Sequence, residues 1–146
     1  MFFHPVTAAR LIAIAVLLAL PVGATAATST IKAPKSGSTY KGKAPYKVTM
    51  QISGRSVEIV TFNFPCGEVT GRTSLNDFAL KRTSKGYRFN ADAHGLVTYS
   101  DELGDENATV HISGRFARDA KSVRGHLRVK SQRCGDTTDL TWRAAR

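Results

Sequence analysis

Short runs in which apolar and polar residues alternate are the feature that most limits the fold of this chain. In the clearest run, Val110, Ile112, Gly114 and Phe116 alternate with polar residues. Successive side chains of a strand point to opposite faces, so this period of two indicates strands with one buried face. Gly, Asn, Asp and Ser separate the runs, and no window has the apolar spacing of a helix. The pattern therefore predicts an all-β protein.

About eight short strands at intervals near ten residues are typical of a β-sandwich or a small barrel. We predict a single antiparallel β-sandwich, Ig-like or jelly-roll-like, with a small barrel as the alternative and the strand order left open. The expected strands are centred on residues 46–52, 57–64, 78–80, 87–91, 96–99, 110–116, 123–129 and 140–142.

Residues 1–26 have the pattern of a secretory signal peptide. Arg10 supplies a positive charge, residues 11–20 form an apolar run, and Ala24-Thr25-Ala26 supplies the small residues of a cleavage site. At 1.5 Å per residue this run is about half as long as a hydrocarbon core of ~30 Å, which argues against a membrane anchor. We expect residues 27–38 to be a flexible linker, residues 39–146 to be one domain, and no membrane span after removal of the signal. The expected location is extracellular or in the cell envelope.

The charge balance is strongly basic. The whole sequence has 21 Lys and Arg against 11 Asp and Glu, a formal charge of +10, and loss of Arg10 with the signal would leave +9. Such an excess favours anionic partners, although export and the lack of a recognition motif argue against specific nucleic-acid binding.

Two cysteines, Cys66 and Cys134, remain after the expected signal. In an oxidising compartment an even pair most often forms a disulfide. Neither cysteine lies in a CxxC motif or at an expected helix N-terminus, so a reactive thiol is the weaker interpretation. We predict a Cys66–Cys134 disulfide.

The strands at 108–117 and 122–130 predict a hairpin with Phe116 opposite Val123. In this register Arg115 lies opposite Arg124, His111 opposite Arg128, and Thr109 opposite Lys130, all on the outer face. A second basic group lies around the expected turn Ser84-Lys85-Gly86. Like charges facing each other in a sheet are destabilising, so the basic face either binds a polyanion or is a well-hydrated surface that keeps the protein soluble. The candidate contact residues are Arg115, Arg124, Arg128, Lys130, Lys81, Arg82, Lys85 and Arg88.

Metal sites have weak support in the sequence. His111 and His126 share the outer face with arginines, and His94 lies in an expected turn, so we interpret the histidines as solvated surface residues. The acidic segment 101–106 departs from the EF-hand pattern, and the sequence leaves open whether it binds Ca²⁺. We predict a hairpin loop there that could neutralise the neighbouring basic hairpin, and we predict no metal and no cofactor.

Catalytic motifs such as GxSxG or HExxH are absent from the sequence. The leading hypothesis is a secreted, non-enzymatic module that binds an anionic polymer, such as a teichoic acid-like polymer or an acidic polysaccharide. The alternative is a structural or protein-interaction module of the envelope without a polyanion ligand. An extracellular hydrolase with two carboxyl groups is the weakest hypothesis.

Four segments carry a resemblance to a known pattern: Gly37–Lys43, Ile112–Phe116, Val123–Leu127, and the closing Cys134 with residues 140–144. They resemble an uncharacterised family of small secreted β-sandwich proteins of high-GC Gram-positive bacteria with a closing Cys…Trp motif. The resemblance covers about residues 37–146 and implies the fold and export. It carries over no catalytic residues.

Overall fold

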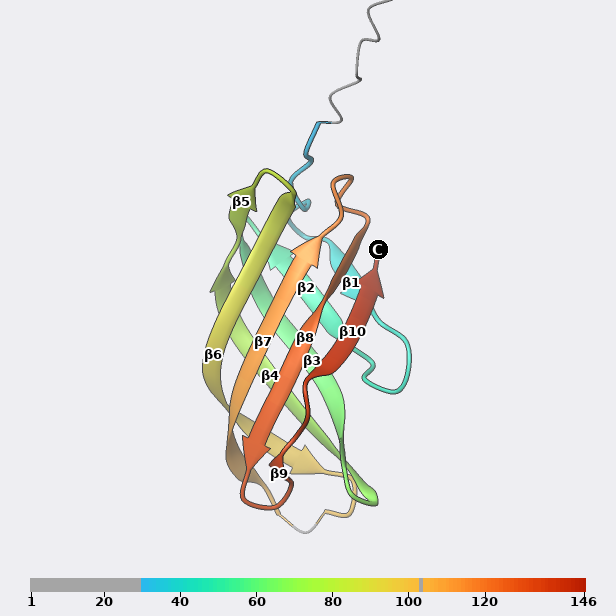
Figure 1. The fold of residues 1–146 in the computed structure, drawn as a ribbon, viewed down its shortest axis with the longest axis vertical. Coiled ribbons are helices and arrows are strands. Elements are labelled where there is room, and N and C mark those ends of the chain that lie inside the picture. Colours follow the sequence, from blue (N-terminus) through green and yellow to red (C-terminus); the bar gives the residue numbers. More distant parts are fainter. Residues whose placement is uncertain (1–29, 103) are drawn as a thin grey trace, which may run out of the picture.

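The structure is a computed structural model that describes residues 30–102 and 104–146, so the expected signal peptide lies outside it. This part of the chain contains ten strands and no helix (Figure 1). The strands are β1 (Thr39–Lys41), β2 (Thr49–Ser53), β3 (Ser56–Cys66), β4 (Val69–Ala79), β5 (Lys81–Thr83), β6 (Gly86–Tyr99), β7 (Glu106–Phe116), β8 (Ser122–Ser131), β9 (Gly135–Asp136) and β10 (Leu140–Ala145). The described residues contain no helix long and apolar enough to cross a membrane.

All ten strands belong to one antiparallel sheet that folds over on itself. Its order is β10-β1-β2-β3-β4-β6-β7-β8-β9, and β10 also pairs with β8. Consecutive long strands are neighbours, so the connectivity is a meander. The closure is uneven: β1 and β10 share only the pair Lys41↔Ala145, and β4 and β6 share three pairs.

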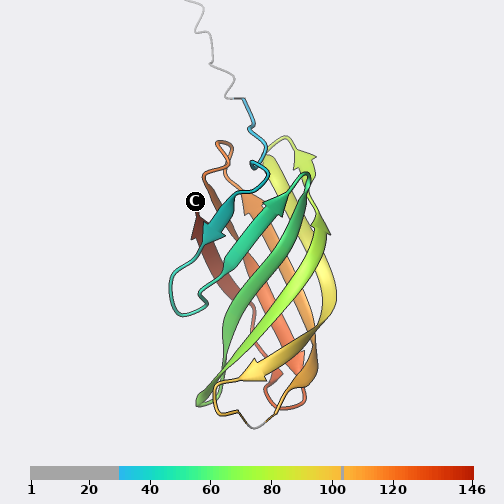
Figure 2. The same cartoon turned by 180° about the vertical axis from the view of Figure 1, so that it is seen from behind.

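The sheet forms two facing layers, as in a sandwich. β6, β7, β8 and β10 make the layer at the front of Figure 1, and β2, β3 and β4 make the layer at the front of Figure 2. The prediction of an antiparallel, sandwich-like all-β fold is confirmed. Between the layers lies a core of alternating inward residues, of which the largest fully buried are Trp142, Tyr40, Phe62, Phe64 and Phe116.

Two adjacent glycines let the front layer pack closely on this core. Gly114 pairs with Gly125 across β7 and β8. A Cβ on Gly114 would lie 2.4 Å from the Phe89 ring, and a Cβ on Gly125 would lie 1.7 Å from the Ser113 carbonyl oxygen. The glycines therefore make room for the rings of Phe89 and Trp142, whose centroids are 6.3 Å apart.

The strand boundaries differ from the sequence expectation in several places. The strand expected at 78–80 is the end of the longer β4, and the three-residue β5 follows it. Segments 87–91 and 96–99 belong to a single strand, β6, because the residues between them continue the ladder to β7 without an apolar alternation. Tyr46 and Val48 precede β2. The short strands β1 and β9 were not expected, since two or three residues are too few to show a period.

Residues 32–38 do not form the flexible linker expected for residues 27–38. The amide of Lys32 donates to the Arg118 carbonyl at 2.8 Å, and the amide of Gly37 donates to the Ile52 carbonyl at 2.7 Å. Pro34 is buried. These contacts hold the segment against the domain although its composition is small and polar.

Candidate functional site

Five basic residues stand opposite one another on five neighbouring strands, the four strands of the front layer and β5, which pairs with β6. The pairs Lys81↔Arg88, Arg88↔Arg115, Arg115↔Arg124 and Arg124↔Arg143 join β5, β6, β7, β8 and β10 in one line across the sheet. We call Lys81, Arg88, Arg115, Arg124 and Arg143 the basic row. All five are exposed. Neighbouring strands lie about 4.8 Å apart, so the row is roughly 19 Å long.

The basic row lacks neutralising partners of its own. Within residues 30–102 and 104–146, no carboxylate lies within ion-pair distance of any of its five side chains. Like charges directly opposite each other destabilise a sheet, and here four such pairs follow in succession. The row is therefore a concentrated, unneutralised positive charge.

The expected hairpin register is confirmed, with Arg115 opposite Arg124, His111 opposite Arg128 and Thr109 opposite Lys130. The structure also brings Lys81 and Arg88 into line with this hairpin. Arg143 was missed because the sequence left the position of the last strand open. The outward direction of Arg143 follows from its alternation with Trp142.

Arg128 and Lys130, two further predicted contact residues, lie outside the basic row and close to a carboxylate. Arg128 donates two hydrogen bonds to the Asp136 carboxylate, and the one from Nε is 2.7 Å long. Lys130 stands opposite the same aspartate. The hydrogen bonds from Arg128 lower the pKa of Asp136. Asp136 thus partly neutralises the charge of these two residues.

Arg82 and Lys85 lie outside the row, although Lys85 borders a hollow that Arg115, Arg124 and Arg143 also line. Arg82 stands opposite Tyr87, one position from Lys81, and so points to the other face of the β5–β6 hairpin. Lys85 occupies the hairpin turn and borders a second hollow of about 750 Å³, which also has Lys41 and Lys43 at its rim.

A groove of about 670 Å³ runs beside the basic row. All five members of the row line it, together with a parallel line of polar residues two positions further along the strands. The pairs Asn90↔Ser113, Ser113↔His126 and His126↔Thr141 place this second line in register. We call Asn90, Ser113, His126 and Thr141 the polar row.

Carboxylates lie beyond the polar row, on the side away from the basic row. Asp92 contacts His111 at 2.7 Å, and Asp139 contacts His126 at 2.9 Å. The interpretation of the histidines as surface residues agrees with their position, but these two have carboxylate partners. Among the described residues, no three His, Cys, Asp or Glu side chains are grouped closely enough to hold a metal ion.

The other layer has a different outer surface. Outward positions of β2, β3 and β4 are mostly uncharged, and Thr61 and Ser74 hydrogen-bond to each other there at 2.8 Å. Arg72 stands between Asn63 and Thr98, without a second cation opposite it. The line of positive charge is thus a property of the front layer.

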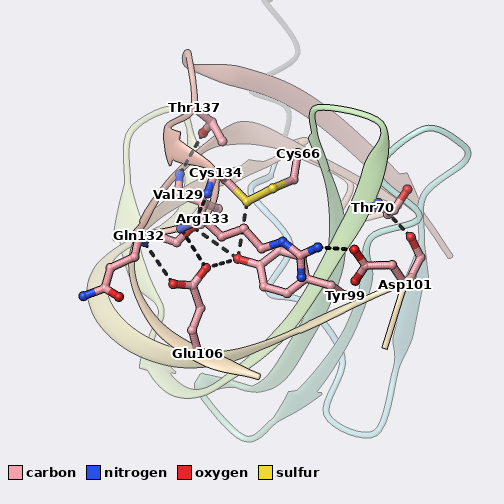
Figure 3. The surroundings of a disulfide bond; sticks show 12 residues. Cys66, Thr70, Tyr99, Asp101, Glu106, Val129, Gln132, Arg133, Cys134 and Thr137 are labelled. Atoms are coloured by element: carbon pink, nitrogen blue, oxygen red, sulfur yellow. Dashed lines mark hydrogen bonds and ion pairs between the residues drawn. A yellow bond between two sulfur atoms is a disulfide. The ribbon is translucent and has the colours of Figure 1, made fainter. Parts of the chain in front are cut away.

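At the opposite end of the strands, the predicted disulfide between Cys66 and Cys134 is confirmed (Figure 3). It joins the end of β3 to the turn after β8. The Tyr99 hydroxyl lies 3.3 Å from the Cys134 sulfur, and burial raises the pKa of this phenol. The Arg133 guanidinium lies 4.5 Å from the centre of the Tyr99 ring and pairs with Asp101.

Glu106 ties the same turn to the start of β7. It accepts a hydrogen bond from the Tyr99 hydroxyl and from the backbone amides of Gln132 at 3.0 Å and Arg133 at 3.2 Å. The Tyr99 hydrogen bond lowers the pKa of Glu106, and the turn amides act in the same direction. Two members of the acidic segment, Asp101 and Glu106, thus neutralise and order this turn instead of the basic hairpin.

Comparison of the chain with protein-family models, with curated proteins and with solved structures found no match. Inferences about function therefore rest on the two rows and the groove.

Proposed function

We propose that this protein is a non-enzymatic binding module for an anionic polymer of the extracellular space or cell envelope, and that the basic row is its contact surface. The observation that carries the proposal is the register of Lys81, Arg88, Arg115, Arg124 and Arg143, which aligns five unneutralised cations on five adjacent strands.

The regular repeat favours a polymer over a small anion. A single phosphate or carboxylate would meet two or three of the cations, whereas a chain of repeated charges would meet all five along roughly 19 Å. Such a ligand would also relieve the repulsion between facing cations, a cost that the free protein carries. Binding of this kind releases counterions and weakens steeply as salt rises.

The proposed location rests on two observations of different kinds. Residues 1–26 have the composition of a signal peptide. The Cys66–Cys134 disulfide is compatible with an oxidising compartment outside the cytoplasm. Anionic polysaccharides and polyol phosphates are the polymers that an exported protein would meet there.

The test compares two variants of equal charge for binding to heparin. One replaces Arg88, Arg115 and Arg124 in the basic row by Gln. The control replaces Lys35, Arg55 and Arg72, which are exposed and lie outside the row, by Gln. Affinities are measured over a series of NaCl concentrations by titration calorimetry, and circular dichroism checks that each variant is folded.

We expect the row variant to lose most of its affinity at low salt. The slope of log Kd against log[NaCl] should fall by about 2, taking ~0.7 per lost contact from single-stranded nucleic acids. The control should keep the wild-type slope. Equal losses in the two variants, or no binding of the wild-type protein at low ionic strength, would refute the proposal.

A further inference from the structure

The polar row carries information about the ligand that the charge alone does not. Asn90, Ser113, His126 and Thr141 lie two residues along the same strands from Arg88, Arg115, Arg124 and Arg143, respectively. Two residues of a strand span about 7 Å, so the two rows run parallel at roughly that separation along the groove wall.

Three members of the polar row are available to a ligand. In the part of the chain that the structure describes, the side chains of Asn90, Ser113 and Thr141 make no hydrogen bond to another residue. Each of them can both donate and accept hydrogen bonds. Between the rows, the backbone of Gly114 and Gly125 also lines the groove.

The carboxylates beyond the polar row determine which groups the ligand can present there. Asp139 lies beside His126, and Asp92 lies two residues beyond Asn90 on β6. A phosphate or carboxylate of the ligand would be repelled on this side. A hydroxyl would not, because it can donate to a carboxylate or to the Asn90 amide oxygen.

We infer that the groove binds an acidic polysaccharide that lies across the strands, with its anionic groups on the basic row and its sugar hydroxyls on the polar row. This inference rests on the proposed function and narrows it. A polyanion without hydroxyl groups could use only the basic row, so the protein should prefer a polyuronate to an inorganic polyphosphate of equal charge.

The test removes the polar row while keeping the basic row. The variant Asn90→Ala/Ser113→Ala/Thr141→Val loses one amide and two hydroxyls from the groove. The matched control, Asn76→Ala/Thr70→Val/Thr98→Val, loses the same number of similar groups from exposed positions on β4 and β6 outside the groove. Both are titrated with polygalacturonate and with polyphosphate of matched total charge, after circular dichroism has shown that they fold.

Three lost hydrogen bonds at about 0.5–1.5 kcal/mol each correspond to a loss of affinity of at least tenfold. We expect the groove variant to lose this much for polygalacturonate and less than twofold for polyphosphate, while the control changes neither. Tighter binding of polyphosphate than of polygalacturonate by the wild-type protein would overturn the inference and leave the proposed function standing. An equal loss of affinity for both polymers in the groove variant would also overturn the inference and leave the proposed function standing. If the wild-type protein binds neither polymer, both proposals fail.

Discussion

Loss of the Cys66–Cys134 disulfide should remove a large part of the free energy of unfolding. The two cysteines are 68 positions apart, and the chain-entropy model assigns about 4 kcal/mol to a loop of this length. Domains of this size are typically stable by about 5–15 kcal/mol, so the loss is a large share.

The other contacts of the turn should keep the loss of stability close to this value of about 4 kcal/mol. Glu106 still accepts the amides of Gln132 and Arg133, and Arg133 still pairs with Asp101 after the sulfurs are removed. The native turn therefore keeps its shape, and the variant loses mainly the constraint on the unfolded chain.

The variant Cys66→Ala/Cys134→Ala should unfold at a temperature lower by about 15 °C, at ~4 °C per kcal/mol for a domain of this size. Differential scanning calorimetry measures the shift, and reduction of the wild-type protein with dithiothreitol gives the same comparison without a substitution. Dithiothreitol should leave the double variant unchanged. A shift below about 4 °C, near 1 kcal/mol, would show that the loop argument is wrong. Because the basic row lies at the other end of the strands, heparin binding by the folded variant should remain.

Three further changes test other parts of the structure. Gly125→Ala would place a Cβ 1.7 Å from the Ser113 carbonyl oxygen, so β7 and β8 must separate. We expect urea unfolding to show a loss of about 1–3 kcal/mol, the typical cost of overpacking. The lowered pKa of Glu106 means that its contribution to stability is present above its unfolded pKa and is lost as pH falls through the folded value. Glu106→Gln should therefore flatten the acid limb of the unfolding midpoint plotted against pH, and an unchanged limb would contradict this assignment. Arg128→Gln should weaken heparin binding less than Arg124→Gln does, because Asp136 already holds the Arg128 guanidinium; equal effects in the two variants would contradict that distinction.

The sequence was sufficient where the signal is local. The alternation in residues 110–116 and 123–129, joined by a short turn, determined both strands and their register, including Arg115 opposite Arg124. The disulfide followed from an even number of cysteines and the expected export. The hairpin prediction uses only residues that are close in the sequence, and the disulfide prediction uses only the number of cysteines and the expected export. Neither requires the strand order.

What the sequence could not provide is the pairing between distant strands. Arg143 reaches the basic row only because β10 pairs with β8, and Arg88 only because β6 pairs with β7. The partners of Arg128 and Arg133 were missed for the same reason, since Asp136 and Asp101 become neighbours only after folding. Residues of the same type therefore differ in their surroundings. Arg124 belongs to the basic row, which has no carboxylate partners, whereas Arg128 is in an ion pair.

The position of the row along the strands shows how the fold can carry a repulsive surface. On β7, Glu106 lies at the first position, within the network around the disulfide, and Arg115 lies next to the last. The covalent link and its hydrogen-bond network thus stabilise one end of the front layer, while the facing cations strain the other. Facing like charges in a sheet cost a fraction of a kcal/mol to about 1 kcal/mol per pair, so four pairs cost no more than the roughly 4 kcal/mol assigned to the disulfide. A solubilising surface would need neither the alignment of five cations nor the adjoining groove with its polar row, whereas the proposed binding of an acidic polysaccharide would use all three.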